Sequence, residues 1–166
     1  MEKFEYVQKN LEALGDRDPL EVLAETPDLL TELFPRLDMR RGCELTHWTA
    51  GEIYCHLADL EIGYGFRLRQ ALAGTEEAQA FDHDRWGIRY RNYESYSARL
   101  ALEAFCGLRR WNLELLRNLE PQDWNRVAYH PQRGPETISF IVKMLAGHDL
   151  RHLKELEYIA SYVEAG

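Results

Sequence analysis

Apolar residues recur every three or four positions along most of this chain, which is the spacing of one face of an α-helix. The segment 48–73 shows this spacing at Ile53, Leu57, Leu60, Tyr64, Leu68 and Ala71. The segment from about 92 to 118 shows it at Leu100, Ala104, Leu108, Trp111 and Leu115, and Leu119 continues it just beyond. We expect both stripes to face the core. A further helix is predicted from about residue 137 to residue 163.

Shorter helices are predicted before these three. Residues 2–14 have the pattern of a short amphipathic helix that ends at a glycine and a polar turn. Pro19 and Pro27 each follow a capping residue, and a helix tolerates proline in its first turn. The two prolines therefore predict two separate short helices, over about 19–25 and 27–35.

Long connections separate the main helices. Residues 74–91 lack helical periodicity and are expected to form a long loop. Its aromatic residues favour a packed conformation: Phe81, Trp86 and Tyr90. A shorter loop is expected over 36–47, and a second long connection runs between Pro121 and Pro135. Four main helices with long crossings predict an all-α four-helix bundle, with a short extra N-terminal helix and a single domain over residues 1–166.

Composition excludes several classes of partner. The 166 residues include 20 basic and 28 acidic side chains, a net charge of −8. Nucleic acid is not an expected partner, because the sequence has no basic cluster of four or more residues. No apolar run approaches the roughly 18–20 residues of a membrane span. Three cysteines without a CxxC pair (Cys43, Cys55 and Cys106), and a first segment unlike a signal peptide, predict a cytoplasmic protein.

Two histidines lie one helical turn apart in the last predicted helix, within "AGHDLRHLKEL". At about 100° per residue, His148 and His152 share a narrow arc with Leu145 and Leu156, so both point into the core. A single buried histidine usually finds a hydrogen-bond partner, but two stacked ones each need a partner within an apolar stripe. Side chains at i and i+4 lie roughly 5–6 Å apart at Cβ, close enough for two imidazoles to share one metal ion.

A third ligand has to come from another helix, and His56 is the histidine best placed to supply it. It lies about 60° from Ile53 on the helical wheel, at the edge of an apolar stripe. The neighbouring Cys55 points about 100° away and is not expected to bind the same ion. The remaining histidines are interpreted as surface or loop residues: His47, His83 and His130.

Metal-binding histidines usually donate their second N–H to a carboxylate, a carbonyl or water. The candidate carboxylates are Glu52, Asp59 and Asp149, although all three also suit a solvated or helix-capping role. Arg67 could meet an anionic substrate near His56 or lie at the surface. Motifs of other chemistries are missing from the sequence, which has no HExxH and no G-x-S-x-G. A di-iron bundle needs Glu-x-x-His on two helices, and the sequence has it once.

Four segments, in this order, resemble the DinB/YfiT-like family of four-helix-bundle metalloproteins. They are "ETPDLLTELFPRL", "HWTAGEIYCHLADLE", "FDHDRW" and "GHDLRHLKEL". The resemblance covers most of the chain and places the family's metal ligands on His56, His148 and His152. It implies a DinB-like bundle of unusual connectivity, a homodimer, and zinc or nickel as the cofactor.

The resemblance also implies an activity. Members with known chemistry include thiol S-transferases that use bacillithiol and isomerases that depend on mycothiol, and the isomerases are typically longer than this chain. We therefore expect a metal-dependent thiol S-transferase acting on a small-molecule substrate, with a low-molecular-weight thiol as its partner. The alternatives are a metal-dependent hydrolase and a non-enzymatic metal-binding stress or sensor protein. Three protein ligands leave a coordination position open, which favours an enzyme.

Overall fold

The computed structural model describes residues 3–74, 83–89 and 91–166. These residues form six α-helices: α1 Lys3–Leu14, α2 Pro19–Leu33, α3 Ala50–Ala73, α4 His83–Arg89, α5 Ala98–Arg117 and α6 Ile138–Ala165. They also form two antiparallel hairpins: β1 Gly42–Cys43 with β2 Thr46–Thr49, and β3 Val127–His130 with β4 Gly134–Thr137. Short 3-10 helices complete the set: η1 Phe34–Arg36, η2 Arg91–Tyr93 and η3 Pro121–Asn125.

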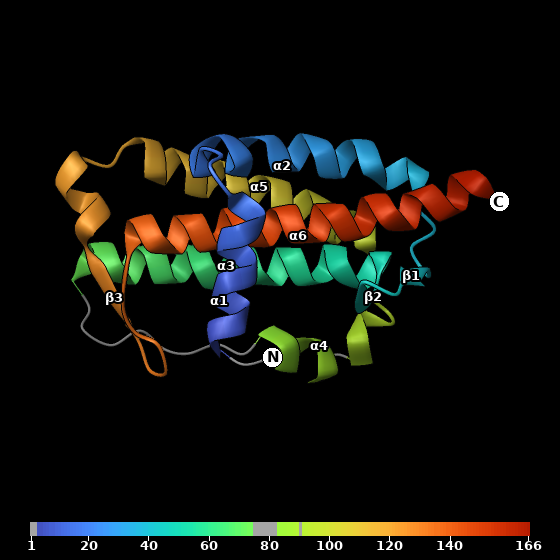
Figure 1. Ribbon diagram of the computed structural model, residues 1–166, viewed down its shortest axis with the longest axis horizontal. Coiled ribbons are helices and arrows are strands. Elements are labelled where there is room, and N and C mark those ends of the chain that lie inside the picture. The colour runs from blue at the N-terminus through green and yellow to red at the C-terminus, as the bar shows by residue number, and fades with distance from the viewer. Residues whose placement is uncertain (1–2, 75–82, 90) are drawn as a thin grey trace.

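The helices α2, α3, α5 and α6 lie side by side as a four-helix bundle, which confirms the predicted fold class (Figure 1). Helices α2 and α6 run in one direction, and α3 and α5 run in the other (Figure 1). Because α3 and α5 are parallel neighbours, the chain between them has to return along the bundle, which explains the long crossing. Among the described residues, none of the helices combines the length and the apolar character that a bilayer crossing requires.

The apolar stripe of α3 lies in the core, as predicted. Thr49 caps the helix: its hydroxyl accepts a hydrogen bond from the backbone N–H of Glu52, whose carboxylate accepts one from the Thr49 N–H at 2.6 Å. Gly74, with a φ of 74°, ends the helix in the left-handed conformation. Every residue predicted for this stripe is at most 3% exposed: Ile53, Leu57, Leu60, Tyr64, Leu68 and Ala71.

The prediction of two short helices over 19–25 and 27–35 was wrong, because α2 continues through Pro27. Proline has no N–H, so the carbonyl of Leu23, one turn earlier, loses its hydrogen bond within the helix. The Arg109 side chain replaces that bond, since its Nη1 donates to the Leu23 carbonyl at 3.1 Å. A contact from α5 thus accommodates a proline inside a helix, and no local sequence signal indicates it.

The predicted core face of α5 was also wrong. Leu100 and Trp111 are each 66% exposed, and the rest of that stripe is exposed or half-buried. The buried face carries Ala101, Leu102, Phe105, Cys106, Arg109, Asn112, Leu113 and Leu116. Arg109 and Asn112 interrupt the apolar pattern of this face with polar side chains, so the periodicity favoured the neighbouring face.

The segment 74–91, predicted as a loop, contains helix α4 and leads into η2. Phe81 and Tyr90, which were expected to pack this loop, lie outside the described residues. Helix α4 packs against Trp48 at Gly87, where a Cβ atom would lie only 2.6 Å from the indole ring. The two hairpins were not predicted either, because strands of two to four residues are too short to show an alternating pattern.

Helix α1 crosses the bundle over α6 (Figure 1). At the crossing, Gly147 of α6 leaves no room for a side chain: a Cβ atom there would lie 1.9 Å from the Asn10 carbonyl oxygen. Asn10 is fully buried, and its side-chain oxygen accepts a hydrogen bond from Arg151 at 2.9 Å. Gly147 therefore sets how closely α1 approaches α6, one residue before His148.

Replacing Gly147 with Ala should lower the free energy of unfolding by about 1–3 kcal/mol, because the added methyl group forces α1 and α6 apart. At an unhindered helical position the same change raises it by roughly 0.5–1 kcal/mol. Urea denaturation followed by circular dichroism measures the difference, and Lys154→Ala, on the exposed side of α6, is the control. A Gly147→Ala protein at least as stable as wild type would contradict this close approach.

Candidate metal centre

Three histidines converge where α3 and α6 face each other. The Nε2 atoms of His56 and His148 lie 3.2 Å apart, and those of His148 and His152 lie 3.1 Å apart. All three residues are buried, between 2% and 7% exposed. The structure thus brings together the three histidines that the sequence pattern predicts, with one ring nitrogen of each within 4.8 Å of the other two.

These separations suit a shared cation better than hydrogen bonds. Each Nε2 atom has either one hydrogen or one lone pair in the ring plane, so the central His148 Nε2 can satisfy only one of its two neighbours. At a metal–nitrogen distance of about 2.0–2.1 Å, adjacent ligand nitrogens are separated by about 3.3 Å in a tetrahedron and about 2.9 Å in an octahedron. The observed separations of 3.1 and 3.2 Å lie between these values, so both neighbouring pairs, His56 with His148 and His148 with His152, are spaced as two ligands of one divalent ion.

One carboxylate beside these rings was not among the predicted residues. Glu155 Oε2 lies 2.6 Å from His152 Nδ1, and Glu155 is 9% exposed. When Nδ1–H donates to Glu155, the lone pair of His152 is on Nε2, which faces the other two histidines. The His-x-x-Glu spacing in "HLKE" places both side chains on one helix face, so the sequence did contain a signal for Glu155.

Aromatic rings cover the histidines. The Trp48 ring stacks on His56, with centroids 5.2 Å apart and planes at 26°. Tyr6 of α1 lies beside His148, with centroids 6.3 Å apart. Burial, reinforced by the nearby Tyr64, raises the pKa of Tyr6 well above its usual value of 10, so this phenol stays protonated at neutral pH. Both α1, through Tyr6, and α4, which packs on Trp48, therefore help to close the site.

The three carboxylates predicted to support the histidines form their hydrogen bonds elsewhere. Glu52 belongs to the capping box of α3. Asp59 accepts a hydrogen bond from the Tyr93 hydroxyl at 2.8 Å, and burial raises the pKa of its carboxyl group. Asp149 is buried and forms an ion pair with Arg109. The carboxylate that the structure places against a histidine is Glu155 instead.

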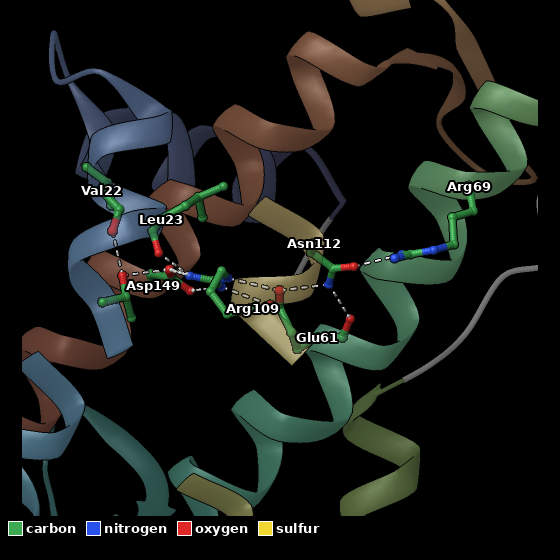
Figure 2. A network of polar contacts seen from close by, with 8 residues as sticks. Val22, Leu23, Glu61, Arg69, Arg109, Asn112 and Asp149 are labelled. Carbon is green, nitrogen blue, oxygen red and sulfur yellow. Dashed lines mark hydrogen bonds and ion pairs between the residues drawn. The ribbon is translucent and has the colours of Figure 1, made fainter. Parts of the chain in front are cut away.

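Arg109 is the centre of a buried polar network between the bundle helices (Figure 2). Its guanidinium donates to both carboxylate oxygens of Glu61 on α3, each at 2.9 Å, and to both of Asp149 on α6, at 2.6 and 3.1 Å. Thr26 of α2 donates to Asp149 at 2.8 Å, and Asn112 of α5 donates to Glu61 at 3.0 Å. All four bundle helices therefore share one set of charge-assisted hydrogen bonds.

The charged groups of this network are shielded from solvent, since Arg109, Glu61 and Asp149 are each 1% exposed. Burial by itself lowers the pKa of the Arg109 guanidinium, but the two carboxylates more than offset this effect and raise it. Burial raises the pKa of the Asp149 carboxyl group against the attraction of Arg109. A buried ion pair adds little net stability over an apolar core, whereas the loss of one member is strongly destabilising. The main effect of the network is therefore on geometry.

The network fixes the relative position of α3 and α6, the two helices that carry the histidines. Glu61 follows His56 by five residues on α3, and Asp149 directly follows His148 on α6. One guanidinium that binds both carboxylates fixes the position of α3 along α6. Because the register is fixed, the ring nitrogens of the two helices can meet at 3.2 Å.

Other candidate residues do not join the site. Cys55 faces a different cavity, between α3 and α5, and burial raises the pKa of its thiol to about 11. The group of residues whose ligand atoms converge is His56, His148 and His152, and it does not include Cys55. His47 is exposed, as predicted, while the side chain of His83, the first residue of α4, lies outside the description.

Two surface predictions were wrong. His130 is buried at the end of β3, where its Nδ1 accepts hydrogen bonds from the backbone N–H groups of Gln132 and Arg133. Arg67 is only 3% exposed, and its guanidinium lies over the Tyr64 ring. Each of these polar side chains is buried because it has a partner that local periodicity does not show.

Comparisons with known proteins agree with the fold. Residues 3–156 match the family model of the DinB superfamily. This chain belongs to the DinB superfamily. The resemblance of its four segments to that family is therefore confirmed.

Two individual proteins are also similar to this DinB chain. A protein from Oceanobacillus iheyensis, named "Putative metal-dependent hydrolase", is 31% identical over 117 residues, which are 66% of this chain and 63% of that protein. The aligned region thus spans less than two thirds of that relative. The solved structure of YfiT from Bacillus subtilis, described as "a probable metal-dependent hydrolase with an unusual four-helix bundle topology", matches with a TM-score of 0.79 at 18% identity. That match covers 99% of this chain and 90% of YfiT, and it shows a common fold.

Replacing Arg109 with Met should lower the free energy of unfolding by about 3–5 kcal/mol, because Glu61 and Asp149 would remain buried without a cation. Arg109→Lys keeps the charge but cannot bind two carboxylates in a bidentate manner, so it should lose part of the same stability. Urea denaturation measures both variants, and Arg117→Met, at an exposed position of α5, is the control. Equal stability of Arg109→Met and wild type would show that the network does not hold the helices.

Proposed function

We propose that His56, His148 and His152 bind one divalent metal ion, and that this DinB protein is a metal-dependent enzyme. The observation that carries the proposal is the convergence of three buried Nε2 atoms at separations of 3.2 and 3.1 Å. Hydrogen bonding among the three rings cannot satisfy all of them, whereas one cation can. Imidazole ligands suit zinc and nickel, and either ion is consistent with these separations.

The residues of the chain prepare the site for the ion. Glu155 accepts a hydrogen bond from the Nδ1–H group of His152 and so keeps the lone pair of that ring on Nε2. The Arg109 network holds α3 and α6 in the register that brings the rings together. Trp48 and Tyr6 cover the rings and limit the access of water to them.

Hydrolysis of a small-molecule substrate is the activity that we propose first. A divalent ion with three protein ligands supplies Lewis-acid chemistry at an open position, where water or a thiol becomes a nucleophile near neutral pH. The names of both similar proteins refer to metal-dependent hydrolases, which supports water as the nucleophile.

Thiol S-transfer is the second candidate, and the set of ligands favours it. Three neutral imidazoles contribute no negative charge to the site, so a divalent ion keeps its full charge to stabilise a thiolate. A low-molecular-weight thiol of the bacillithiol type would then replace water as the attacking group. The two activities share one site and differ in what occupies its open position.

Replacing His152 with Ala should reduce the bound metal from one equivalent per chain to a small fraction, because two imidazoles hold a divalent ion weakly. Glu155→Gln should weaken metal affinity by roughly 10–100-fold, since it removes the charge that orients His152. Elemental analysis of protein purified without a histidine tag measures the first change, and competition with a chromophoric chelator measures the second. The exposed His47 provides the control variant, His47→Ala. Full metal retention by His152→Ala would refute the ligand assignment.

Titration of the cobalt-loaded protein with thiols should separate the two activities. A thiol transferase should develop a sulfur-to-cobalt charge-transfer band in the near ultraviolet, because a thiolate binds the ion directly. A hydrolase should show no such band, and its rate should rise with pH through a pKa near 7. Bacillithiol has to be among the thiols, because the non-reacting part of a substrate contributes much of its affinity.

The absence of a band with every thiol at millimolar concentration would exclude thiol transfer. Thiol-induced bands without hydrolysis of any ester or amide substrate would exclude the hydrolase. If the loaded protein shows neither property, the enzymatic proposal is wrong and a non-enzymatic metal-binding role takes its place.

A further inference from the structure

A cavity of about 390 Å³ lies between α1, the β3–β4 hairpin and the start of α6. Helix α1 and the hairpin both extend past α3 toward the lower edge of Figure 1. The volume is within the range of small-molecule pockets, about 300–1,000 Å³. The apolar residues that line the cavity are Phe4, Val7, Pro135 and Phe140. Phe4 is 88% exposed, so an apolar ligand in this cavity would remove it from water.

One side of the cavity is charged, because Arg133 and Glu136 also line it. The Nε–H group of Arg133 donates to the carboxylate of Glu136, which is 4% exposed. In the part of the chain that the structure describes, the N–H groups on the two Nη atoms of Arg133 have no acceptor. A guanidinium binds a carboxylate through two parallel N–H groups, so the Nη end of Arg133 suits a ligand carboxylate.

The first turn of α6 favours a negative charge at the same place. Thr137, which caps the helix, and Phe140 both line the cavity. A helix of 28 residues has a partial positive charge at its N-terminus, and this charge stabilises an anion nearby. The cavity therefore combines apolar walls with one positively charged side. A small molecule with an apolar body and a carboxylate group matches both parts.

Helix α1 connects this cavity with the histidines. Phe4 and Val7 line the cavity, while Tyr6, which lies between them in the sequence, is beside His148 with ring centroids 6.3 Å apart. Burial raises the pKa of Tyr6, and the positive charge of Arg133 partly offsets this effect, so the phenol and the guanidinium are neighbours. A molecule that extends from the cavity along Tyr6 therefore approaches the metal centre.

We infer that this cavity binds the carboxylate end of an elongated small molecule whose other end reacts at the metal centre. The inference rests on the proposed function, because it concerns the substrate of the same site. Phe140 in the cavity precedes His148 on α6 by eight residues, or about 12 Å along the helix axis. The two ends of the molecule are then separated by a similar distance. Binding of the non-reacting end positions the reacting end.

Binding of phenylbutyrate to the cobalt-loaded protein tests the cavity without turnover. This probe has a carboxylate and an apolar ring, and phenylbutyramide is its neutral counterpart. In isothermal titration calorimetry the amide should bind about 10-fold more weakly or less, because it lacks the charge that the guanidinium recognises. The cobalt absorption bands should not change, since the probe occupies the cavity and not the ion. Absence of binding, equal binding of the amide, or a shift of the cobalt bands would overturn the inference.

Two substitutions in the charged pair should change this affinity in opposite directions. Arg133→Gln should weaken phenylbutyrate binding by about 10-fold, because it removes the guanidinium. Glu136→Gln should strengthen binding by about 3-fold, because it removes a negative charge beside the ligand carboxylate. Arg117→Gln, at an exposed position of α5, is the control. If the pair only holds the hairpin in place, both single variants bind more weakly, and that result would overturn the inference.

A double variant separates recognition from misfolding. Arg133→Gln alone leaves the buried carboxylate of Glu136 without its cation, whereas Arg133→Gln with Glu136→Gln leaves no unpaired charge. The double variant should bind phenylbutyrate as weakly as Arg133→Gln does. Wild-type affinity in the double variant would show that the guanidinium does not recognise the carboxylate.

Ester hydrolysis tests the link to the metal centre. Nitrophenyl half-esters of linear dicarboxylic acids have a carboxylate at one end and a scissile bond at the other. The kcat/KM of a half-ester should exceed that of its methyl-capped diester by about 10-fold where the chain spans about 12 Å. Arg133→Gln should remove this preference through KM. Absence of the preference at every chain length would overturn the inference. If none of the esters is hydrolysed while phenylbutyrate still binds through Arg133, the proposed hydrolysis has failed and the binding site has not.

Discussion

One arginine holds the four bundle helices in position. Arg109 extends from α5 into the core and binds Glu61 on α3, Asp149 on α6 and the Leu23 carbonyl on α2. All of these groups are buried, so the loss of any one leaves a polar atom where water cannot solvate it. A helix that moved by one turn would break several of these bonds at once. The histidine cluster depends on this constraint, because its three rings come from two of the clamped helices.

Pro27 in α2 and Arg109 in α5 compensate for each other in hydrogen bonding. A guanidinium has five N–H donors, and burial requires an acceptor for each. Glu61 and Asp149 supply four acceptors, and the fifth is the Leu23 carbonyl. That carbonyl is available because Pro27, one turn later, has no N–H to donate to it. The carbonyl that α2 leaves without a backbone partner thus accepts the fifth hydrogen bond of the buried Arg109 guanidinium of α5.

The fold and the three histidines could be predicted because both follow from local periodicity. His148 and His152 lie within an apolar stripe, and His56 lies beside another whose apolar members are all buried. Glu155 was also within reach, through its i+3 spacing from His152. The continuity of α2 and the core face of α5 were not, because both depend on Arg109. An arginine in a sequence indicates a surface position, and only the acceptors from three other helices reverse that expectation.

The exposure of the apolar outer face of α5 has the same cause as the wrong prediction of its core face. Its core face carries Arg109 and Asn112, so folding of one chain does not require the apolar residues on the opposite side. The apolar residues of that other side therefore stay outside the core, with Leu100 and Trp111 each 66% exposed. The same arginine that fixes the register of α3 and α6 thus also decides which face of α5 turns inward.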